Sequence, residues 1–131
     1  MTFQLREIEV FRPYANEVPE DLLWSLGFAQ DVIDRWLAAD LVRVAKLGEQ
    51  VMGLYAMDIG DGVTYQLHGV AVAKHARKKG LGRWLVGHAI GVAESKGGRH
   101  VYFPCAKAGR FFAAIGFVAG PDGQCFDMYR E

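Results

Sequence analysis

The stretch VAKHARKKGLG, residues 72–82, places four Lys or Arg side chains and two glycines at the start of a predicted helix. Glycines let the backbone approach an anion closely, and the free N–H groups and dipole of a first helical turn attract negative charge. Lys78, Lys79 and Arg83 would add attraction for further phosphate groups. The stretch is neither a Walker A loop nor a dinucleotide fingerprint. It therefore predicts a backbone cradle for a phosphate-bearing ligand without naming that ligand.

Charge is unevenly distributed along the chain, although its 15 basic and 15 acidic residues balance. Residues 1–61 hold 11 acids and 5 bases, whereas residues 62–121 hold 9 Lys or Arg and a single acid, Glu94. Blocks of one sign favour a charged partner, although a solvated surface is the simpler alternative. A nucleic-acid partner is not expected, because the total charge is zero and neither zinc-finger spacing nor an RNP-type aromatic motif is present.

Length and composition indicate one globular domain spanning residues 1–131, with 51% hydrophobic and 23% charged residues. The longest uncharged run, residues 62–73, is too short to cross a membrane, and the N-terminus does not resemble a signal peptide. Cys105 and Cys125 lack CxxC spacing and are typical of free thiols. We therefore expect a cytoplasmic protein without a membrane partner.

Strand and helix signals alternate along the chain and predict an α/β (α+β) fold. Strands are predicted at residues 3–10, 41–47, 50–59, 63–72 and 99–106, helices at 18–27, 29–40, 80–97 and 109–116, and a terminal strand pair around 121–123. The strands on either side of the longest helix should be parallel, because a crossover of this length requires it. Val32, Trp36 and Leu37 are expected on one helix face, and Gly87 and Gly91 are expected to mark close helix-to-sheet packing.

Four ordered segments together resemble the GNAT superfamily of acyl-CoA-dependent N-acetyltransferases. Arg77, Gly80 and Gly82 match its acyl-CoA signature, in which Arg or Gln is followed by two residues, Gly, one residue, and Gly or Ala. GEQVMGLYAM (residues 48–57) is similar to its central hairpin strand, with Gly53 in the usual place. AGRFFAAIGF (residues 108–117) is similar to its last helix. The similarity covers residues 41–117 by motif and the N-terminal third by element order.

The resemblance implies a mixed, mostly antiparallel sheet whose central parallel strand pair splays apart, flanked by about four helices. Acetyl-CoA would lie in the opening as acyl donor, and no metal is expected. The strand backbone would pair with the pantetheine arm, and the turn would hold the pyrophosphate. The residues expected to bind acetyl-CoA are Val70, Ala71, Val72, Arg77, Lys78, Lys79, Gly80, Leu81, Gly82, Arg83, Cys105 and Phe112.

Gln66 and His68 are the candidate catalytic residues, two apart on the strand that leads to the turn. The family often has Glu where Gln66 stands, and a glutamine cannot accept a proton. His68 is therefore the better candidate for the base that deprotonates the acceptor amine. The alternative is a strand histidine held by a hydrogen bond in the core.

The residue that protonates the departing thiolate is left open by the sequence. The family's usual Tyr in the last helix is replaced by Phe112, which cannot donate a proton. Solvent, Cys105 or Tyr102 are the alternatives. Cys105 also occupies a position where the family commonly has an Asn.

The resemblance implies transfer of an acetyl group directly from acetyl-CoA to a primary amine on a small molecule or a peptide. Trp24, Phe28 and Trp36 are typical of core positions, although in this family the N-terminal helices border the acceptor pocket. The acidic N-terminal block would suit a cationic acceptor. Phe112 and Gln66 also leave room for a second hypothesis, a non-catalytic acyl-CoA-binding regulator on the same fold. The sequence does not indicate an oligomeric state.

Overall fold

The computed structural model of the chain describes residues 3–105 and 107–128. Within these residues, seven strands form one sheet in the order β1-β2-β3-β4-β5-β7-β6. The strands are β1 (Glu9–Phe11), β2 (Leu41–Leu47), β3 (Gln50–Asp58), β4 (Thr64–Val72), β5 (His100–Phe103), β6 (Val118–Ala119) and β7 (Gln124–Asp127). The helices are α1 (Glu20–Ser25), α2 (Gln30–Leu37), α3 (Leu81–Ser95) and α4 (Gly109–Ile115), with short 3₁₀ turns η1 (Leu5–Glu7), η2 (Ala15–Glu17) and η3 (Lys74–Ala76).

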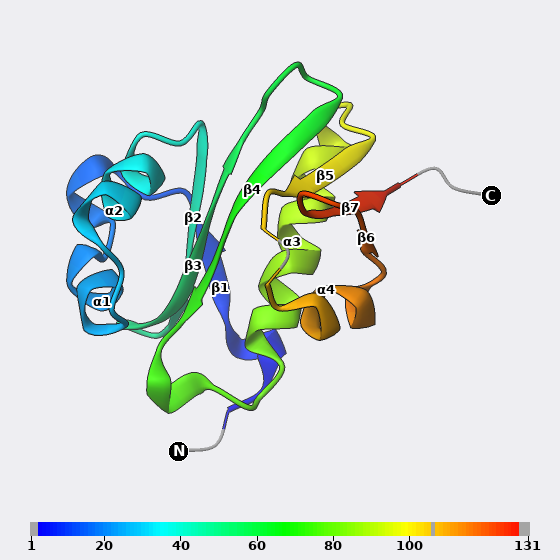
Figure 1. Cartoon of the computed structure of the whole chain (residues 1–131). Helices are drawn as coiled ribbons and strands as arrows, with labels where there is room; N and C mark the ends of the chain where they lie inside the picture. Colours follow the sequence, from blue (N-terminus) through cyan, green and yellow to red (C-terminus); the bar gives the residue numbers. More distant parts are fainter. Residues whose placement is uncertain (1–2, 106, 129–131) are drawn as a thin grey trace.

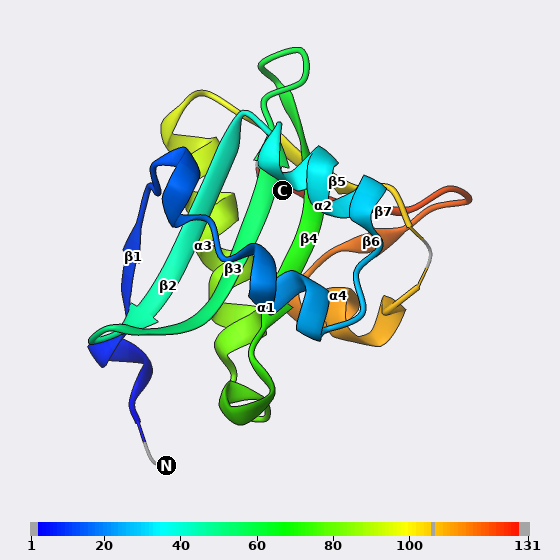
Figure 2. The same cartoon turned by 90° about the vertical axis from the view of Figure 1, so that its left-hand side faces the viewer.

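The helices cover both faces of the sheet, α1 and α2 on one side and α3 and α4 on the other (Figure 1). Seen from the side of the N-terminal helices, α1 and α2 cross the central strands (Figure 2). Each face has its own apolar core. The core beneath α3 includes Leu67, Leu85 and Val101, and the core beneath α1 and α2 includes Leu23, Ile33 and Leu54. The sheet is therefore buried on both faces at its centre, which explains why residues 52–57 of β3 are all buried.

Gly53 allows β3 to lie close to its neighbours. A Cβ at this position would lie 2.5 Å from the carbonyl oxygen of Ala71 on β4 and 3.2 Å from Leu85 Cδ1 on α3. Because the first of these atoms is backbone, a side chain could be admitted only by moving the strand.

The pair β4–β5 is parallel, joined by α3, and it separates soon after it begins. Its register runs through Thr64↔His100, Tyr65↔Val101 and Gln66↔Tyr102, whereas β4 continues to Val72. The other strand pairs are antiparallel. The prediction of a mostly antiparallel sheet with a splayed parallel pair is therefore confirmed.

A β-bulge at His68 changes which side of the sheet the residues of β4 face. Ala56 pairs with Gly69 but Met57 pairs with Leu67, so one residue of β4 is extra. Gly69 has φ +150°, and a Cβ there would lie 3.1 Å from Trp36 Cζ2. Below the bulge Leu67 packs in the α3 core; above it Val70 packs against the same core. The bulge thus leaves His68 and Gly69 together on the other side.

Several expectations about elements and faces were wrong in detail. Residues 3–10 contain η1 and only the start of β1, because Gln4 N donates to Glu7 Oε2 at 2.8 Å and closes a 3₁₀ turn. On α2 the buried side chains are Ile33 and Trp36, and β5 ends at Phe103, with Ala106 outside the described residues. Gly87 and Gly91 do not mark close packing: both are exposed, and a Cβ on either would have no atom within 4 Å.

Candidate active site

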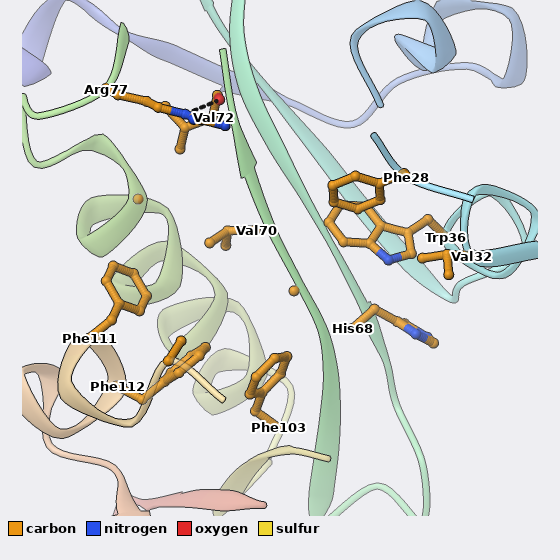
Figure 3. A pocket seen from close by; sticks show the side chains of 13 residues that line it. Phe28, Val32, Trp36, His68, Val70, Val72, Arg77, Phe103, Phe111 and Phe112 are labelled. Carbon is orange, nitrogen blue, oxygen red and sulfur yellow. Dashed lines mark hydrogen bonds between the residues drawn. The ribbon is translucent and has the colours of Figure 1, made fainter. Parts of the chain in front are cut away.

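A cavity of about 420 Å³ opens where β4 and β5 separate. Figure 3 shows its walls on the two sides of β4: Phe28, Val32, Trp36 and His68 on one, and Val70, Phe103, Phe111 and Phe112 on the other. Gly69, Val72, Arg77, Gly82 and Ala108 complete the lining. The cavity is mostly apolar, and His68 and Arg77 are the titratable side chains among the described residues that line it.

A second recess of about 380 Å³ continues the cavity toward the start of α3. The two hollows share Val72, Arg77, Gly82 and Phe111. The recess is further lined by Ala76, Lys78, Gly80, Leu81 and Arg83. A long ligand could therefore lie along β4, with one end in the opening between β4 and β5 and the other at the basic turn, residues 77–80, before α3.

The turn before α3 presents unpaired backbone N–H groups to this recess. Gly80 has φ +82° and Lys78 has φ +64°, so the chain bends sharply into the helix. The N–H of Trp84 bonds to the Gly80 carbonyl at 3.0 Å, which leaves the amides of Leu81, Gly82 and Arg83 without a helical partner. Within residues 3–105 and 107–128, this helix end has no side-chain cap. The arrangement suits a phosphate, because oriented amides and the helix dipole both favour negative charge.

The upper half of β4 offers its backbone to the opening between the strands. The β4–β5 register ends at Gln66, so the backbone of Val70, Ala71 and Val72 has no strand partner on the β5 side in the part of the chain that the structure describes. The Ala71 side chain is buried in the α1–α2 core, so only its backbone can face the opening. The Val72 carbonyl accepts a hydrogen bond from Arg77 Nε at 3.3 Å, which ties this side chain to the strand end.

His68 is held by a carboxylate that the sequence analysis did not identify. Its Nε2 lies 2.8 Å from Asp58 Oδ2, and the ring is only 15% exposed. The other oxygen of Asp58 accepts a hydrogen bond from Asp40 N at 3.0 Å, and Asp40 Oδ2 accepts one from Ile59 N at 2.9 Å. Because a carboxylate only accepts hydrogen bonds, Nε2 carries the ring hydrogen and Nδ1 keeps the lone pair. A ring fixed in this way can accept a proton at Nδ1.

Other expected site residues lie away from the cavity. Gln66 is exposed in the paired part of β4, and neither Gln66 nor Lys79 lines the two hollows. Cys105 is also outside the lining, and its Sγ accepts a hydrogen bond from Lys107 N at 3.4 Å. Tyr102 faces the β6–β7 hairpin, where it lines a separate pocket.

Phe112 forms part of an aromatic floor beneath the splay. It is 3% exposed and stacks on Phe103 with ring centroids 4.5 Å apart, and Phe111 and Phe117 meet it edge-on at 5.1 and 5.0 Å. Phe112 therefore contributes apolar contact surface to the cavity but has no hydroxyl group that could donate a proton.

The N-terminal segment contributes a wall of the cavity. Phe28 and Trp36, which the sequence suggested as core residues on a segment that borders the acceptor pocket in the resembled family, line it together with Val32, and Trp36 also belongs to the α1–α2 core. Trp24 is 55% exposed and lies outside the lining. No spacing in the sequence predicted Val32 or Asp58, because the first is placed by the packing of α2 on the sheet and the second by the β3–β4 register.

In the described part of the chain, neither a metal-binding cluster of side chains nor a membrane-spanning helix is found. No group of three or more His, Cys, Asp or Glu side chains among residues 3–105 and 107–128 is arranged to hold a metal ion. In the same residues, none of the helices has the length and apolar character to span a bilayer.

Comparisons with known proteins identify the fold and the family. A family model described as acetyltransferase (GNAT) family matches residues 4–117. The structure is similar to an IAA acetyltransferase from Bacillus cereus ATCC 14579, with 25% identity, a TM-score of 0.74, and coverage of 86% of this chain and 78% of that one. A GNAT family acetyltransferase from Elizabethkingia anophelis with acetyl-CoA bound is 23% identical, with a TM-score of 0.76 and coverage of 87% and 78%.

The fold is shared with more distant enzymes as well. An aminoglycoside 6'-acetyltransferase type Ii is 14% identical, with a TM-score of 0.78 and coverage of 94% of this chain and 99% of that one. No curated protein matches the chain in sequence. With the family model spanning most of its length and a splayed β4–β5 pair at its centre, this chain belongs to the GNAT family of acetyltransferases.

Proposed function

We propose that this protein is an N-acetyltransferase that transfers an acetyl group from acetyl-CoA directly to a primary amine. One observation carries the proposal: the opening between β4 and β5 shares four lining residues with the recess at the start of α3, where three amides have no helical partner. An elongated ligand with an acyl thioester at one end and a pyrophosphate at the other matches this shape and charge.

The residues present fit acetyl-CoA. The amides of Leu81, Gly82 and Arg83 would hold the pyrophosphate, with added attraction from the basic side chains of the turn. The backbone at 70–72 pairs with β3 but has no strand partner on the β5 side among the described residues, and there it would bond to the pantetheine arm. When bound, acetyl-CoA supplies an electrophilic thioester carbon. The acetyl-CoA-bound structure of the similar Elizabethkingia anophelis protein supports this assignment.

His68 is our candidate for the group that removes the proton from the acceptor amine. The amine nitrogen must lose a proton as it forms the new bond to the acetyl carbon, and the carbon–sulfur bond breaks. His68 lines the cavity with Nδ1 as its accepting nitrogen, and Asp58 fixes the ring. The departing thiolate takes its proton from solvent, since Phe112 has no hydroxyl and neither Tyr102 nor Cys105 lines the cavity.

The alternative is a regulator that binds acyl-CoA without turning it over. Two positions favour this alternative. At Phe112 and Gln66 the resembled family has residues that move protons, whereas here Phe112 is packed among aromatic rings and Gln66 is exposed. Both hypotheses predict acyl-CoA binding, so they differ only in chemistry.

Two measurements in sequence test the proposal. Thermal unfolding with and without CoA is expected to show a higher midpoint with CoA, because a ligand that binds the folded state stabilises it. Thiol release from acetyl-CoA across a panel of primary amines and peptides is then expected for at least one amine, with the N-acetylated product detected by mass spectrometry. Tight CoA binding without release for any acceptor would favour the regulator, and no CoA binding would contradict both hypotheses.

The cellular compartment is part of the proposal. Cys105 and Cys125 are both free thiols, which is typical of a reducing compartment. We infer that the protein acts in the cytoplasm.

A further inference from the structure

We propose that the acceptor is a primary amine with an apolar, ring-containing group, and that this group packs on Phe28, Val32 and Trp36. The inference rests on the proposed function and adds the substrate class. It departs from the expectation, drawn from the acidic N-terminal block, that the acceptor is strongly cationic.

The two walls of the cavity would serve different ligands. Val70, Phe103 and Phe112 belong to the α3–α4 side of the sheet, next to the recess at the basic turn. Phe28, Val32 and Trp36 pack with the core on the α1–α2 side, where His68 also lies (Figure 3). An amine that loses its proton to His68 must therefore rest its body against the wall formed by the N-terminal helices.

This acceptor wall is largely aromatic, and its Trp36 is closely packed. The rings of Phe28 and Trp36 meet edge-on with centroids 5.2 Å apart. Trp36 is 3% exposed. Its ring packs closely on Gly69, since a Cβ added at Gly69 would lie only 3.1 Å from Trp36 Cζ2, and this packing fixes the ring in place. Phe28 and Val32 are partly exposed and present the surface that a ligand can touch. Such a wall favours a flat apolar body through burial and edge-to-face contact.

The described lining of the cavity offers no carboxylate to a cationic ligand. No Asp or Glu is among the described residues that line it. Asp31 forms an ion pair with Arg35 at 3.8 Å, and Asp34 accepts a hydrogen bond from Gln30 Nε2 at 2.8 Å; both acids are exposed on α2. Asp58 is occupied by His68 and by Asp40 N. A polycation would leave its extra charges without partners in an apolar site, which is costly.

A panel of primary amines tests the inference. Thiol release is measured with phenethylamine, propylamine, spermidine and a lysine-containing peptide. The expected order places phenethylamine first, with kcat/KM about tenfold or more above propylamine, because the ring adds several apolar groups to the contact. Preferred use of spermidine or of the peptide would overturn the inference while leaving the acetyltransferase proposal intact.

Substitutions on the acceptor wall supply the matched control. Val32→Asp is expected to lower kcat/KM for phenethylamine about tenfold or more and to affect propylamine less, because it adds an unpaired charge beside the ring. Val118→Asp is the control, since Val118 is 63% exposed on β6 and outside the lining. Phe28→Ala is a second test that removes contact surface without adding charge. Unchanged amine preference in both Val32→Asp and Phe28→Ala would overturn the inference.

Acceptor binding without chemistry separates failure of the inference from failure of the function. Calorimetric titration of phenethylamine into the CoA-loaded protein is expected to give a dissociation constant about tenfold or more below that of propylamine. Binding with this preference, but without thiol release from acetyl-CoA, would contradict catalysis and support the acceptor site. Thiol release without this preference in binding or turnover would contradict the acceptor class alone.

Discussion

The side chains of Asp58 and His68 meet where β3 and β4 pair irregularly, although Asp58 pairs with Gln66 in the register and His68 is the extra residue of the bulge; their 2.8 Å contact is the most specific polar feature beside the cavity. The two residues are ten positions apart and meet only because the hairpin closes with an extra residue at the bulge. Asp40, at the start of β2, fixes the second carboxylate oxygen. The orientation of His68, the proposed base on β4, is thus set by Asp58 on β3 and by Asp40 next to β2.

Asp58→Asn is expected to lower kcat about tenfold or more and to leave CoA affinity unchanged. The amide oxygen of the substituted side chain would still accept from Asp40 N, so its NH₂ would face His68 Nε2. Nε2 would then have to accept, Nδ1 would carry the hydrogen, and the base would be lost. Steady-state kinetics measures the effect, which should fall on kcat with the acceptor KM little changed. Recovery of activity in Asp58→Glu would support positioning of His68, whereas an unchanged kcat in Asp58→Asn would exclude it.

A second histidine should affect stability and not catalysis. His88 on α3 lies with Nδ1 2.8 Å from the Tyr55 hydroxyl, on the opposite side of the sheet from α1 and α2. Burial raises the pKa of Tyr55 well above its usual value, so the phenol donates to the neutral ring. Burial, followed by the nearby Arg43, lowers the pKa of His88 below 6.5. The folded protein therefore resists protonation of His88.

The pH dependence of stability tests this pair. Below about pH 6.5 the unfolded chain binds a proton at His88 more readily than the folded chain, so the free energy of unfolding should fall as pH decreases. His88→Gln keeps an acceptor for Tyr55 and removes the titration. Urea denaturation at about pH 7.5 and about pH 5.5 should show a smaller loss in His88→Gln than in the wild type. Equal losses in both proteins would show that His88 does not carry this dependence.

Among the elements, the turn before α3 is the proposed phosphate site. Gly80→Glu is expected to abolish CoA binding, because φ of +82° is costly for any L-residue and a carboxylate would repel the phosphates. Lys79→Ala should weaken binding by less than about tenfold in a salt-dependent way, since this side chain lies outside the recess. Calorimetric titration of CoA at two salt concentrations measures both.

Gly91→Ala is the matched control for these two changes. Gly91 lies in the exposed middle of the same helix, and a Cβ there meets nothing within 4 Å. The substitution should raise the free energy of unfolding by up to about 1 kcal/mol and leave CoA affinity unchanged. If both Gly80→Glu and Lys79→Ala bind CoA normally, the turn is only a solvated connection.

Elements were predicted from sequence more reliably than the faces they bury. The Val- and Leu-rich pattern and the glycine that follows it predicted β2 at residues 41–47, as observed. The glycines at its two ends predicted α3 to within two residues of each observed end. The opening segment was misjudged because a local hydrogen bond between Gln4 and Glu7 competes with strand pairing. The bulge at His68 has no signal in hydrophobic periodicity, since it follows from the pairing of β3 with β4.

For the molecule as a whole, four ordered motifs and the order of the elements indicated the fold, and one continuous segment, residues 72–82, predicted the proposed donor side of the site. The acceptor wall and the partner of His68 could not be predicted in the same way. Trp36 reaches the cavity through the packing of α2 on the sheet, Phe28 reaches it from the connection before α2, and Asp58 meets His68 through strand register. Contacts between segments distant in sequence leave no short motif.

The distribution of charge over the molecule agrees with this division. The basic segment 62–121 supplies Arg77, Lys78 and Arg83 to the hollow, whereas the acids of α2 lie on its exposed surface. Charge therefore concentrates where a phosphate-bearing donor would bind. The proposed acceptor wall, Phe28, Val32 and Trp36, would instead bind its ligand through apolar contacts.

The central claim is that the donor is bound at the turn before α3 while His68, on the other side of β4, moves the proton. The most direct test measures CoA affinity and acetyl transfer in the same His68→Ala protein, after a thermal melt has shown that it is folded. The account predicts an unchanged CoA dissociation constant, a loss of about 100-fold or more in kcat at neutral pH, and partial recovery when imidazole is added. Wild-type turnover in His68→Ala without added imidazole would contradict it.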